Sequence, residues 1–375
     1  MGKIGLITFH SAYNFGSTLQ AYATQKIIEN LGYDCQIINY RMNEQKSYYS
    51  LYRTSYGAKT FVKDLMQLPM HAERVARANG YEKFISKYMN LTKEVSEPND
   101  VYAMYDQFDQ IVSGSDQIWN KHANELHRAA WEYMYPYLLK GFSGKKISYA
   151  SSTGNMLDPA ELRKVAAVVK DFSSISMREK TSAETFSKLL KRDIPVVLDP
   201  TLLFNRESWI DMLPVKKISG DPYIMYYSLC GIKGYKAKIE AIKKLSQKRN
   251  MKVILVTPLA STPFLGSNIE PHPEYSTIEF LNAIFNANMI VTDSYHGSLF
   301  SLNFNKDIYS ICGQNVSDFR KTDIFKRVGL EDRLVKSIDE VGIREFTPID
   351  YDKVNTRLDE FRASSIKYLK DALSD

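Results

Sequence analysis

The chain alternates short apolar runs with stretches whose apolar residues recur at helical spacing, and this alternation restricts the possible folds more than any other feature. The run Lys3–Phe9 is typical of a buried strand, and the following stretch, Gly16–Leu31, has apolar residues at positions 19, 23, 27, 28 and 31. Gly32 ends the predicted helix, and Cys35–Tyr40 has the composition of a second strand. A strand, a helix and a strand in this order predict a parallel sheet with helices on its faces.

Further strands extend this pattern along the chain. They are predicted at 110–113, 146–150, 174–177, 196–198, 223–228, 252–257, 289–292 and 307–311, before a final amphipathic helix over 350–372. We therefore predict an α/β protein of two Rossmann-like domains facing across a cleft, with ligand sites at the carboxyl ends of strands. The predicted N-terminal domain is 1–192, with a charge-rich helical insertion over about 57–100. The predicted C-terminal domain is 193–375 and includes the terminal helix.

Composition narrows the class of protein. Forty-nine Lys and Arg against 43 Asp and Glu give a net charge of +6, which suits anionic small molecules and is weak for a nucleic-acid-binding protein. No apolar run approaches the roughly 18 residues of a transmembrane helix, and the N-terminal run is too short for a signal peptide. Cys35, Cys230 and Cys312 are too far apart to indicate a disulfide framework or a metal site. We expect a cytoplasmic protein without a metal.

Two polar segments follow predicted strands of the N-terminal domain. His10, Asn14 and Gly16 lie just before a helix, whose free N–H groups suit a phosphate or carboxylate; alternatively, they only shape a turn. The second segment combines polar side chains with an indole: Ser115, Asp116, Gln117, Trp119 and Asn120. An aromatic face beside amides suits a sugar acceptor, and the alternative is a helix cap next to a core tryptophan.

Two further segments suit an anionic donor. Arg178 ends a predicted strand, where its planar guanidinium could bind a carboxylate or phosphate, or could pair with Glu179 or Glu184. Asp293, Ser294 and His296 lie where an apolar strand passes into an apolar helix. Histidine is the side chain whose ordinary pKa suits proton transfer near neutral pH, and the alternative is a buried histidine bonded to backbone.

Six segments, in this order, resemble those of the polysaccharide pyruvyl transferase family, from residue 3 to about residue 312. They are ITFHSAYNFGSTLQAYA, SGSDQIWN, ISYASSTG, SMREKTSAE, VLDPTLLF and TDSYHGSLFSLNF. The resemblance implies a glycosyltransferase-B-like pair of Rossmann-like domains. It also implies an enzyme that moves pyruvyl from phosphoenolpyruvate onto two hydroxyls of a sugar, as a ketal, in cell-surface polysaccharide synthesis. Exopolysaccharide and capsule are products of this kind.

The resemblance also implies roles for single residues. His296 matches the family histidine that does acid–base work, Arg178 matches an arginine expected to bind the donor anion, and Arg320 resembles a weaker anion contact. We expect the remaining donor contacts at Asp293, Ser294 and Gly297. The acceptor contacts are expected at His10, Asn14, Gly16, Ser115, Asp116, Gln117, Trp119 and Asn120.

Phosphoenolpyruvate would be a co-substrate, and no cofactor is expected. The acceptor would be a sugar or a lipid-linked oligosaccharide, and in the second case the positive net charge would favour contact with the inner face of the membrane.

One position departs from the family pattern. The family has Arg-Leu-His where this chain has Ser294-Tyr295-His296, so one guanidinium is missing. Either Arg320, Lys321 or a helix N-terminus takes its place, or this branch of the family has a different donor or weakened activity. Two other functions therefore remain open: a nucleotide-sugar-dependent glycosyltransferase of the same architecture, and a non-catalytic sugar-binding protein.

Overall fold

The protein divides into two units, which are described separately. A computed structural model describes residues 2–154, 156, 158–218, 220–229, 234–257, 265–312, 319–345 and 347–374; Cys230 lies outside them. The first unit consists of Met1–Ser55, Glu82–Leu203 and Asp359–Asp375. The second unit consists of Tyr56–Tyr81 and Phe204–Leu358.

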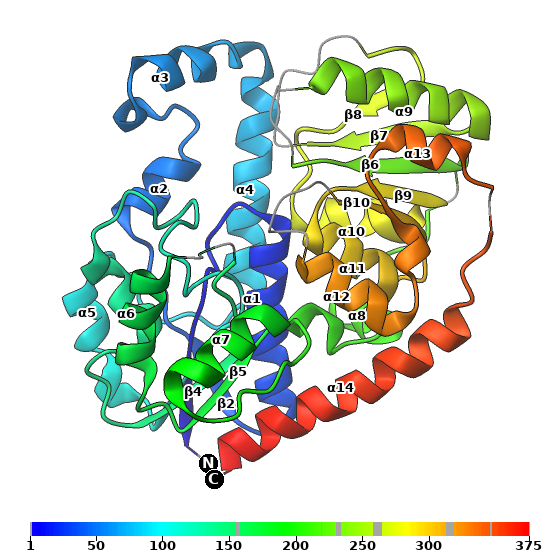
Figure 1. The fold of residues 1–375 in the computed structure, drawn as a ribbon. Helices are drawn as coiled ribbons and strands as arrows, with labels where there is room; N and C mark the ends of the chain where they lie inside the picture. Colours follow the sequence, from blue (N-terminus) through cyan, green and yellow to red (C-terminus); the bar gives the residue numbers. More distant parts are fainter. Residues whose placement is uncertain are drawn as a thin grey trace. The chain divides into compact units, whose positions relative to one another are not determined.

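The first unit contains a parallel sheet in the order β2-β1-β3-β4-β5 (Figure 1). The strands are β1 (Lys3–Ile7), β2 (Asp34–Ile37), β3 (Gln110–Ser113), β4 (Lys145–Ser151) and β5 (Ser174–Met177). This is the flavodoxin-like order, which reverses between β1 and β3. Ligands of such sheets bind beyond the carboxyl ends of the strands at that reversal.

Helices cover this first sheet. They are α1 (Phe15–Asn30), α2 (Asn43–Tyr49), α5 (Pro98–Tyr102), α6 (Pro159–Val169) and α7 (Lys180–Leu190), with a 3₁₀ segment at Trp131–Leu138. The 3₁₀ segment, α6 and α7 share one apolar core with the strands. Helix α6 begins where the Asp158 side chain accepts from the N–H of Ala160, with proline next in the chain, as the sequence Asp-Pro-Ala-Glu indicates.

The second unit contains a parallel sheet in the order β11-β10-β9-β6-β7-β8. The strands are β6 (Tyr223–Tyr227), β7 (Lys252–Val256), β8 (Ile269–Pro271), β9 (Met289–Thr292), β10 (Asp307–Ile311) and β11 (Leu334–Val335). This is the Rossmann order, and it reverses between β6 and β9.

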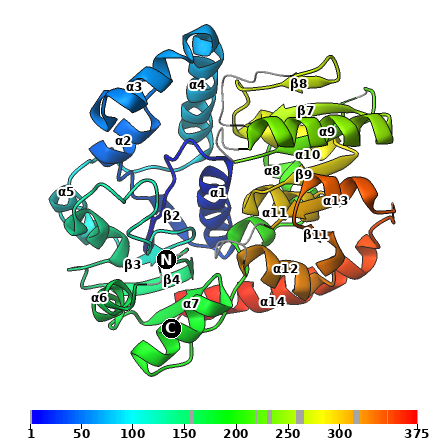
Figure 2. The same cartoon turned by 45° about the horizontal axis from the view of Figure 1, so that its top comes forward.

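Several helices accompany this sheet in the second unit. They are α3 (Ala58–Leu65), α8 (Arg206–Met212), α9 (Tyr235–Arg249), α10 (Thr277–Asn286), α11 (Tyr295–Asn303), α12 (Phe319–Val328) and α13 (Ile338–Ile343). Helices α9 and α13 lie side by side and pack on one face of the sheet (Figure 1 and Figure 2). The rings of Phe280 and Phe300 join α10 to α11.

Two helices belong to both units, and the predicted boundaries are corrected accordingly. Helix α4 (His71–Tyr88) changes unit at residue 81, and α14 (Tyr351–Ser374) changes at residue 358. The end of α14 joins the first unit because the Tyr368 hydroxyl donates to the carbonyl of Ser148 in β4. The division falls after Leu203 rather than after residue 192. The predicted strand at 196–198 forms only an isolated bridge, Met177 to Val196.

The helical segment 57–100 is therefore not one insertion into the first domain. Residues 56–81 group with the second unit, where the Arg77 guanidinium donates to the carbonyl of Thr257. Gly80 lies so close to Ser276 that a Cβ at Gly80 would stand 2.3 Å from the Ser276 hydroxyl. Within the described residues, none of the helices has the length and apolarity needed to span a bilayer.

Candidate functional site

Asp116 lies at the carboxyl edge of the first sheet, where the strand order reverses. Its side chain is almost buried and accepts from the Ser17 hydroxyl of α1 at 2.6 Å and from the Gln117 N–H at 2.9 Å. Asp116 has φ of 73°, in the left-handed region that asparagine and aspartate tolerate better than most residues. The carboxylate thus links the end of β3 to the start of α1.

Arg178, at the end of β5, is the centre of a buried ionic network. Its guanidinium donates to Asp199 at 2.8 Å and to Glu179 at 3.2 Å, and lies 3.6 Å from Asp116. The exposed fractions of these side chains are 1% for Arg178, 8% for Asp116, 4% for Glu179 and 0% for Asp199. Arg178 thus compensates three buried carboxylates, and these contacts favour the ion-pair alternative over donor binding.

Glu179 retains an unused hydrogen-bonding atom in this network. One of its oxygens accepts from the Ser152 hydroxyl at 2.6 Å, whereas Oε2 is buried and has no hydrogen-bond partner among the described residues. An unpaired buried carboxylate oxygen is costly. The edge of the sheet therefore carries more negative charge than its one arginine balances.

The prediction that Trp119 stacks on a sugar is wrong. Its indole is fully buried, packs against Phe172 and Phe186, and donates to the Ser113 hydroxyl at 3.2 Å. Asn120 is also buried, and its amide donates to Gln117 at 3.0 Å. Trp119 is therefore a core tryptophan, as the alternative interpretation of this segment predicted. The helix cap that the same alternative predicted is not formed by Asp116.

The acceptor contacts predicted for His10 and Ser115 are also contradicted, since both side chains are 0% exposed. The His10 ring hydrogen-bonds with the Asn39 amide oxygen at 2.8 Å, and burial lowers its pKa to about 4, so it is neutral. The Ser115 hydroxyl donates to the carbonyl of Ala150 at 2.9 Å. Both residues stabilise the ends of strands.

Asn14 and Gly16 form the start of α1. The Asn14 side chain is the N-cap and accepts from the N–H groups of Gly16 at 2.9 Å and Ser17 at 3.3 Å. Those two N–H groups are therefore occupied by the cap, which supports the turn-shaping alternative over an anion site.

Three residues that the sequence analysis missed lie near Asp116. The rings of Tyr13 and Tyr49 are 5.5 Å apart, and the Tyr49 hydroxyl donates to Glu125. Burial and the nearby Asp116 raise the pKa of Glu125 to about 7. Partly exposed aromatic rings beside a carboxyl group suit a sugar better than buried Trp119 does. Tyr13 and Tyr49 are far from Asp116 in the sequence, so no local sequence pattern connected them with it.

Asp293 is the corresponding residue of the second unit. It follows β9, and its carboxylate accepts from the Ser228 hydroxyl and the Leu229 N–H, both at 2.7 Å. Ser228 and Leu229 follow β6, the neighbouring strand across the reversal of order. In both units, an aspartate and a serine thus link the segments that follow two neighbouring strands, where a ligand is expected.

His296 lies in the first turn of α11 and is 8% exposed. Ser294 caps this helix by accepting from the Gly297 N–H at 3.2 Å. A Cβ on Gly297 would stand 2.8 Å from both Thr292 and Tyr227, so glycine lets the helix approach the strand ends. The predicted residues Asp293, Ser294, His296 and Gly297 are therefore brought together.

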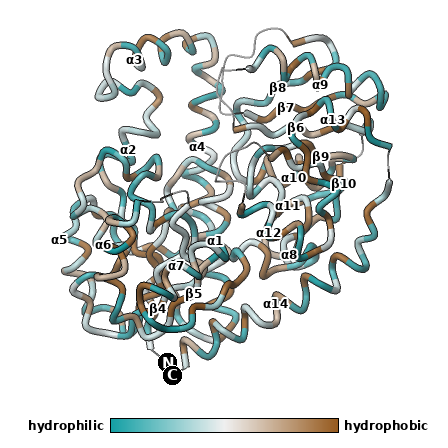
Figure 3. The backbone as a smooth tube through the Cα atoms, viewed as in Figure 1, coloured by the Kyte–Doolittle hydropathy of each residue, from teal (hydrophilic) through white to brown (hydrophobic). Residues whose placement is uncertain are grey.

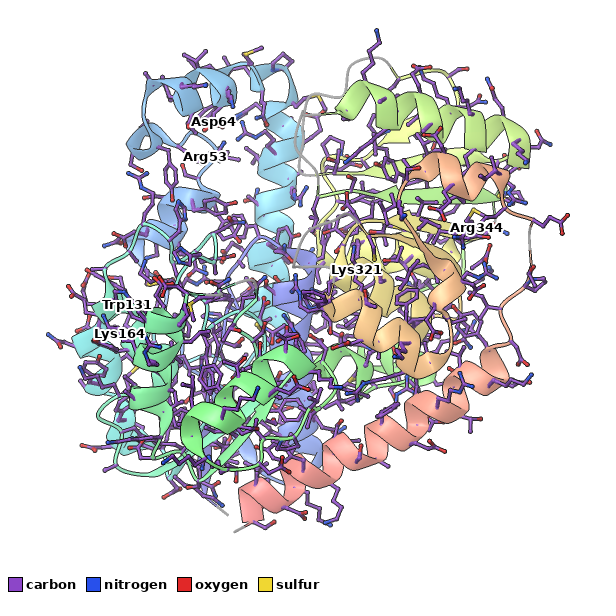
Figure 4. All side chains as sticks on the ribbon, in the orientation of Figure 1. Arg53, Asp64, Trp131, Lys164, Lys321 and Arg344 are labelled. Carbon is purple, nitrogen blue, oxygen red and sulfur yellow. The ribbon has the colours of Figure 1, made fainter. Side chains whose placement is uncertain are left out.

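Two cations of α12 lie beside this segment. Lys321 is buried, and its ammonium donates to the carbonyls of Asp293 at 3.0 Å and Ile311 at 2.5 Å (Figure 4). The Arg320 guanidinium lies 5.1 Å from the centre of the Tyr295 ring. The two cations thus contact the residues on either side of Ser294, the position at which the family pattern has an arginine.

The segment around His296 lies within a match to a known protein family. The model of the polysaccharide pyruvyl transferase family matches residues 14–310. The chain belongs to this family. It is therefore a transferase of polysaccharide biosynthesis, and the resemblance found in the sequence is confirmed. No curated protein sequence is significantly similar to the chain.

Solved structures show the same fold. A putative UDP-N-acetylglucosamine 2-epimerase from Listeria monocytogenes has a TM-score of 0.52 at 10% identity, over 94% of each chain. The UDP-GlcNAc 2-epimerase from Neisseria meningitidis, bound to UDP-GlcNAc, has a TM-score of 0.53 at 9% identity, over 98% of this chain and 94% of its own. An Arabidopsis thaliana protein complexed with UDP-L-rhamnose has a TM-score of 0.51 at 12% identity, over 98% of each chain. These likenesses confirm the glycosyltransferase-B-like α/β fold class.

Arg178→Met should reduce the free energy of unfolding of this pyruvyl transferase family member by about 3–5 kcal/mol, because it leaves buried carboxylates without their cation. The measurement is equilibrium denaturation. Asp116→Asn in the same chain should restore part of the loss. If Arg178→Lys instead raised the KM for the donor many-fold at unchanged stability, Arg178 would be a donor contact.

Glu125→Gln should stabilise the protein more at pH 8 than at pH 5. A carboxyl whose pKa is raised to about 7 contributes stability below its ordinary pKa near 4.5, and this contribution disappears as the pH rises through about 7. Glutamine mimics the protonated form at both pH values. Chemical denaturation at the two pH values measures the difference, with exposed Glu132→Gln as the control. Equal effects at both pH values would contradict the raised pKa.

Proposed function

We propose that this protein transfers the pyruvyl group of phosphoenolpyruvate onto two hydroxyls of a sugar, as a ketal, during the synthesis of a cell-surface polysaccharide. The observation that carries the proposal is the position of His296 in the capped first turn of α11, beside the cations of α12. Family membership supports the reaction class. The two anionic groups of phosphoenolpyruvate need positive partners, and Arg320 is the partner we propose in place of the missing family arginine.

The proposed reaction begins with proton transfer. Protonated His296 delivers its proton to the enol carbon C3, and an acceptor hydroxyl forms a bond to C2 while losing its proton to a base. The C2–O bond to phosphate then breaks, and inorganic phosphate leaves. A second hydroxyl of the sugar adds to C2 and closes the ketal, so that one hydroxyl proton ends on C3 and the other on phosphate. Phosphoenolpyruvate is a co-substrate, and the proposal requires no cofactor.

The acceptor in this proposal is a sugar or a lipid-linked oligosaccharide, handled on the cytoplasmic side of the membrane. We propose the Tyr13 and Tyr49 rings and Gln117 as acceptor contacts, because these side chains are partly exposed. A lipid-linked acceptor would bring the protein to the membrane face, where its net charge of +6 favours anionic lipids.

A thermal-shift panel tests the donor. Phosphoenolpyruvate should raise the melting temperature, whereas UDP-sugars and GDP-sugars should not. Release of inorganic phosphate on addition of a sugar acceptor would then show turnover. Stabilisation by a nucleotide sugar instead would favour a glycosyltransferase, and carbohydrate binding without any donor effect would favour a non-catalytic protein.

His296→Asn should lower kcat by about 10²–10⁴-fold, because asparagine can hydrogen-bond but cannot deliver a proton. The measurement is phosphate release at saturating phosphoenolpyruvate, together with the thermal shift that phosphoenolpyruvate produces. That shift should persist in the variant, since the donor site remains. Near-full turnover of His296→Asn would place the acid elsewhere.

Arg320→Gln should raise the KM for phosphoenolpyruvate by on the order of tenfold or more, which corresponds to the loss of a hydrogen bond to a charged group. Steady-state kinetics with varied phosphoenolpyruvate measure the change. Exposed Lys326 on the same helix provides the control, because Lys326→Gln removes an equal charge without touching Tyr295. An equal rise in both variants would indicate only a long-range effect of charge.

A further inference from the structure

The segment around α3 exposes large apolar side chains to solvent. Of the nine large apolar residues that are exposed in the described part of the chain, four lie within seven positions. They are Val62 at 54%, Leu65 at 38%, Met66 at 72% and Leu68 at 53% exposure. Single exposed apolar residues are ordinary, but such a concentration marks an interaction surface. In Figure 3 the tube through α3 alternates between hydrophobic and hydrophilic residues.

Helix α3 is inverted with respect to an ordinary surface helix, whose apolar side faces the protein. Val62, Leu65 and Met66 have the i, i+3, i+4 spacing of one helical face, and that face is exposed. Asp64, which projects from the opposite side by this spacing, is 0% exposed. The helix thus buries its acid and presents its apolar side outward, so that burial within this chain does not explain the apolar face.

The charge around the apolar face is positive. Lys59 and Lys63 lie one turn apart on α3 and are both exposed. Asp64 is the only acidic residue between positions 57 and 72, and it is buried. Lysines beside an apolar stripe can extend their ammonium groups to the level of lipid headgroups while the stripe enters the acyl region.

We propose that α3 and the following turn, residues 58–68, form a docking surface for a bilayer that contains anionic lipids. The apolar face of Val62, Leu65, Met66 and Leu68 would lie in the interface, and Lys59 and Lys63 would pair with anionic headgroups. This surface would provide the membrane contact that the proposed function includes. Binding to lipid itself does not require that the protein transfers pyruvyl.

A second copy of the chain fits this surface less well. Stable protein interfaces bury roughly 800 Å² per partner, which is more than four partly exposed side chains can supply. The positive side chains on both copies would also repel each other. Anchoring to an interface requires less area, because apolar insertion and electrostatic attraction add.

Flotation of the full-length protein with lipid vesicles tests this proposal, without any substrate. The protein should float with vesicles of phosphatidylcholine and phosphatidylglycerol, and much less with phosphatidylcholine alone or at high salt. Leu65→Gln with Met66→Gln should reduce the bound fraction by on the order of tenfold or more. Lys59→Gln with Lys63→Gln should remove the preference for the anionic vesicles by a similar factor.

Ile343→Gln is the matched control, because Ile343 is 80% exposed in the same unit and lies in another helix; its vesicle binding should be unchanged. Melting temperatures and activity on a soluble acceptor should be equal in all variants. Equal vesicle binding by the Leu65/Met66 variant would overturn the proposal. A dimer of the wild type that this variant dissociates, measured by light scattering, would identify a second copy as the occupant instead.

Discussion

Parallel pairing of strands is the constraint on which the rest of this structure depends. Parallel strands need crossover connections, and those connections cover both faces of the sheet with helices. All strands of a sheet then end at one edge, where loops connect them to the following helices. In both units the polar segments of the sequence collect at this edge, since each follows directly after a buried strand.

The two edges are built in the same way. Asp116 accepts from Ser17 in the first unit, and Asp293 accepts from Ser228 in the second, in each case across the point where strand order reverses. The aspartates thereby hold together the segments that follow neighbouring strands. They differ in what surrounds them. The first edge is acidic around one buried guanidinium, whereas the second has an imidazole and two cations of α12. We therefore propose the second edge for the anionic donor and the first edge for the hydroxylated acceptor.

Several expectations followed directly from local pattern and agree with the structure. The strands Gln110–Ser113 and Ser174–Met177 depend on neighbours within a few residues. Trp119 was misassigned because an aromatic residue beside amides has the same local pattern in a core as at a sugar site. Its position depends on Phe172 and Phe186, which are more than fifty residues away. The boundary after Leu203 was missed for a similar reason, since α14 returns to the first sheet.

The sequence by itself determined the class of fold and the family, because hydrophobic periodicity and short motifs are local properties of a chain. Only the tertiary structure decided which polar side chains are buried and which are accessible. Arg178 paired with Asp116 and Asp199, and Tyr49 with Glu125, through packing between elements distant in sequence. The same holds for α3, whose outward apolar face has the periodicity of any amphipathic helix. Periodicity gives the angle between residues on a helix, whereas the neighbouring elements determine which side of the helix faces the solvent.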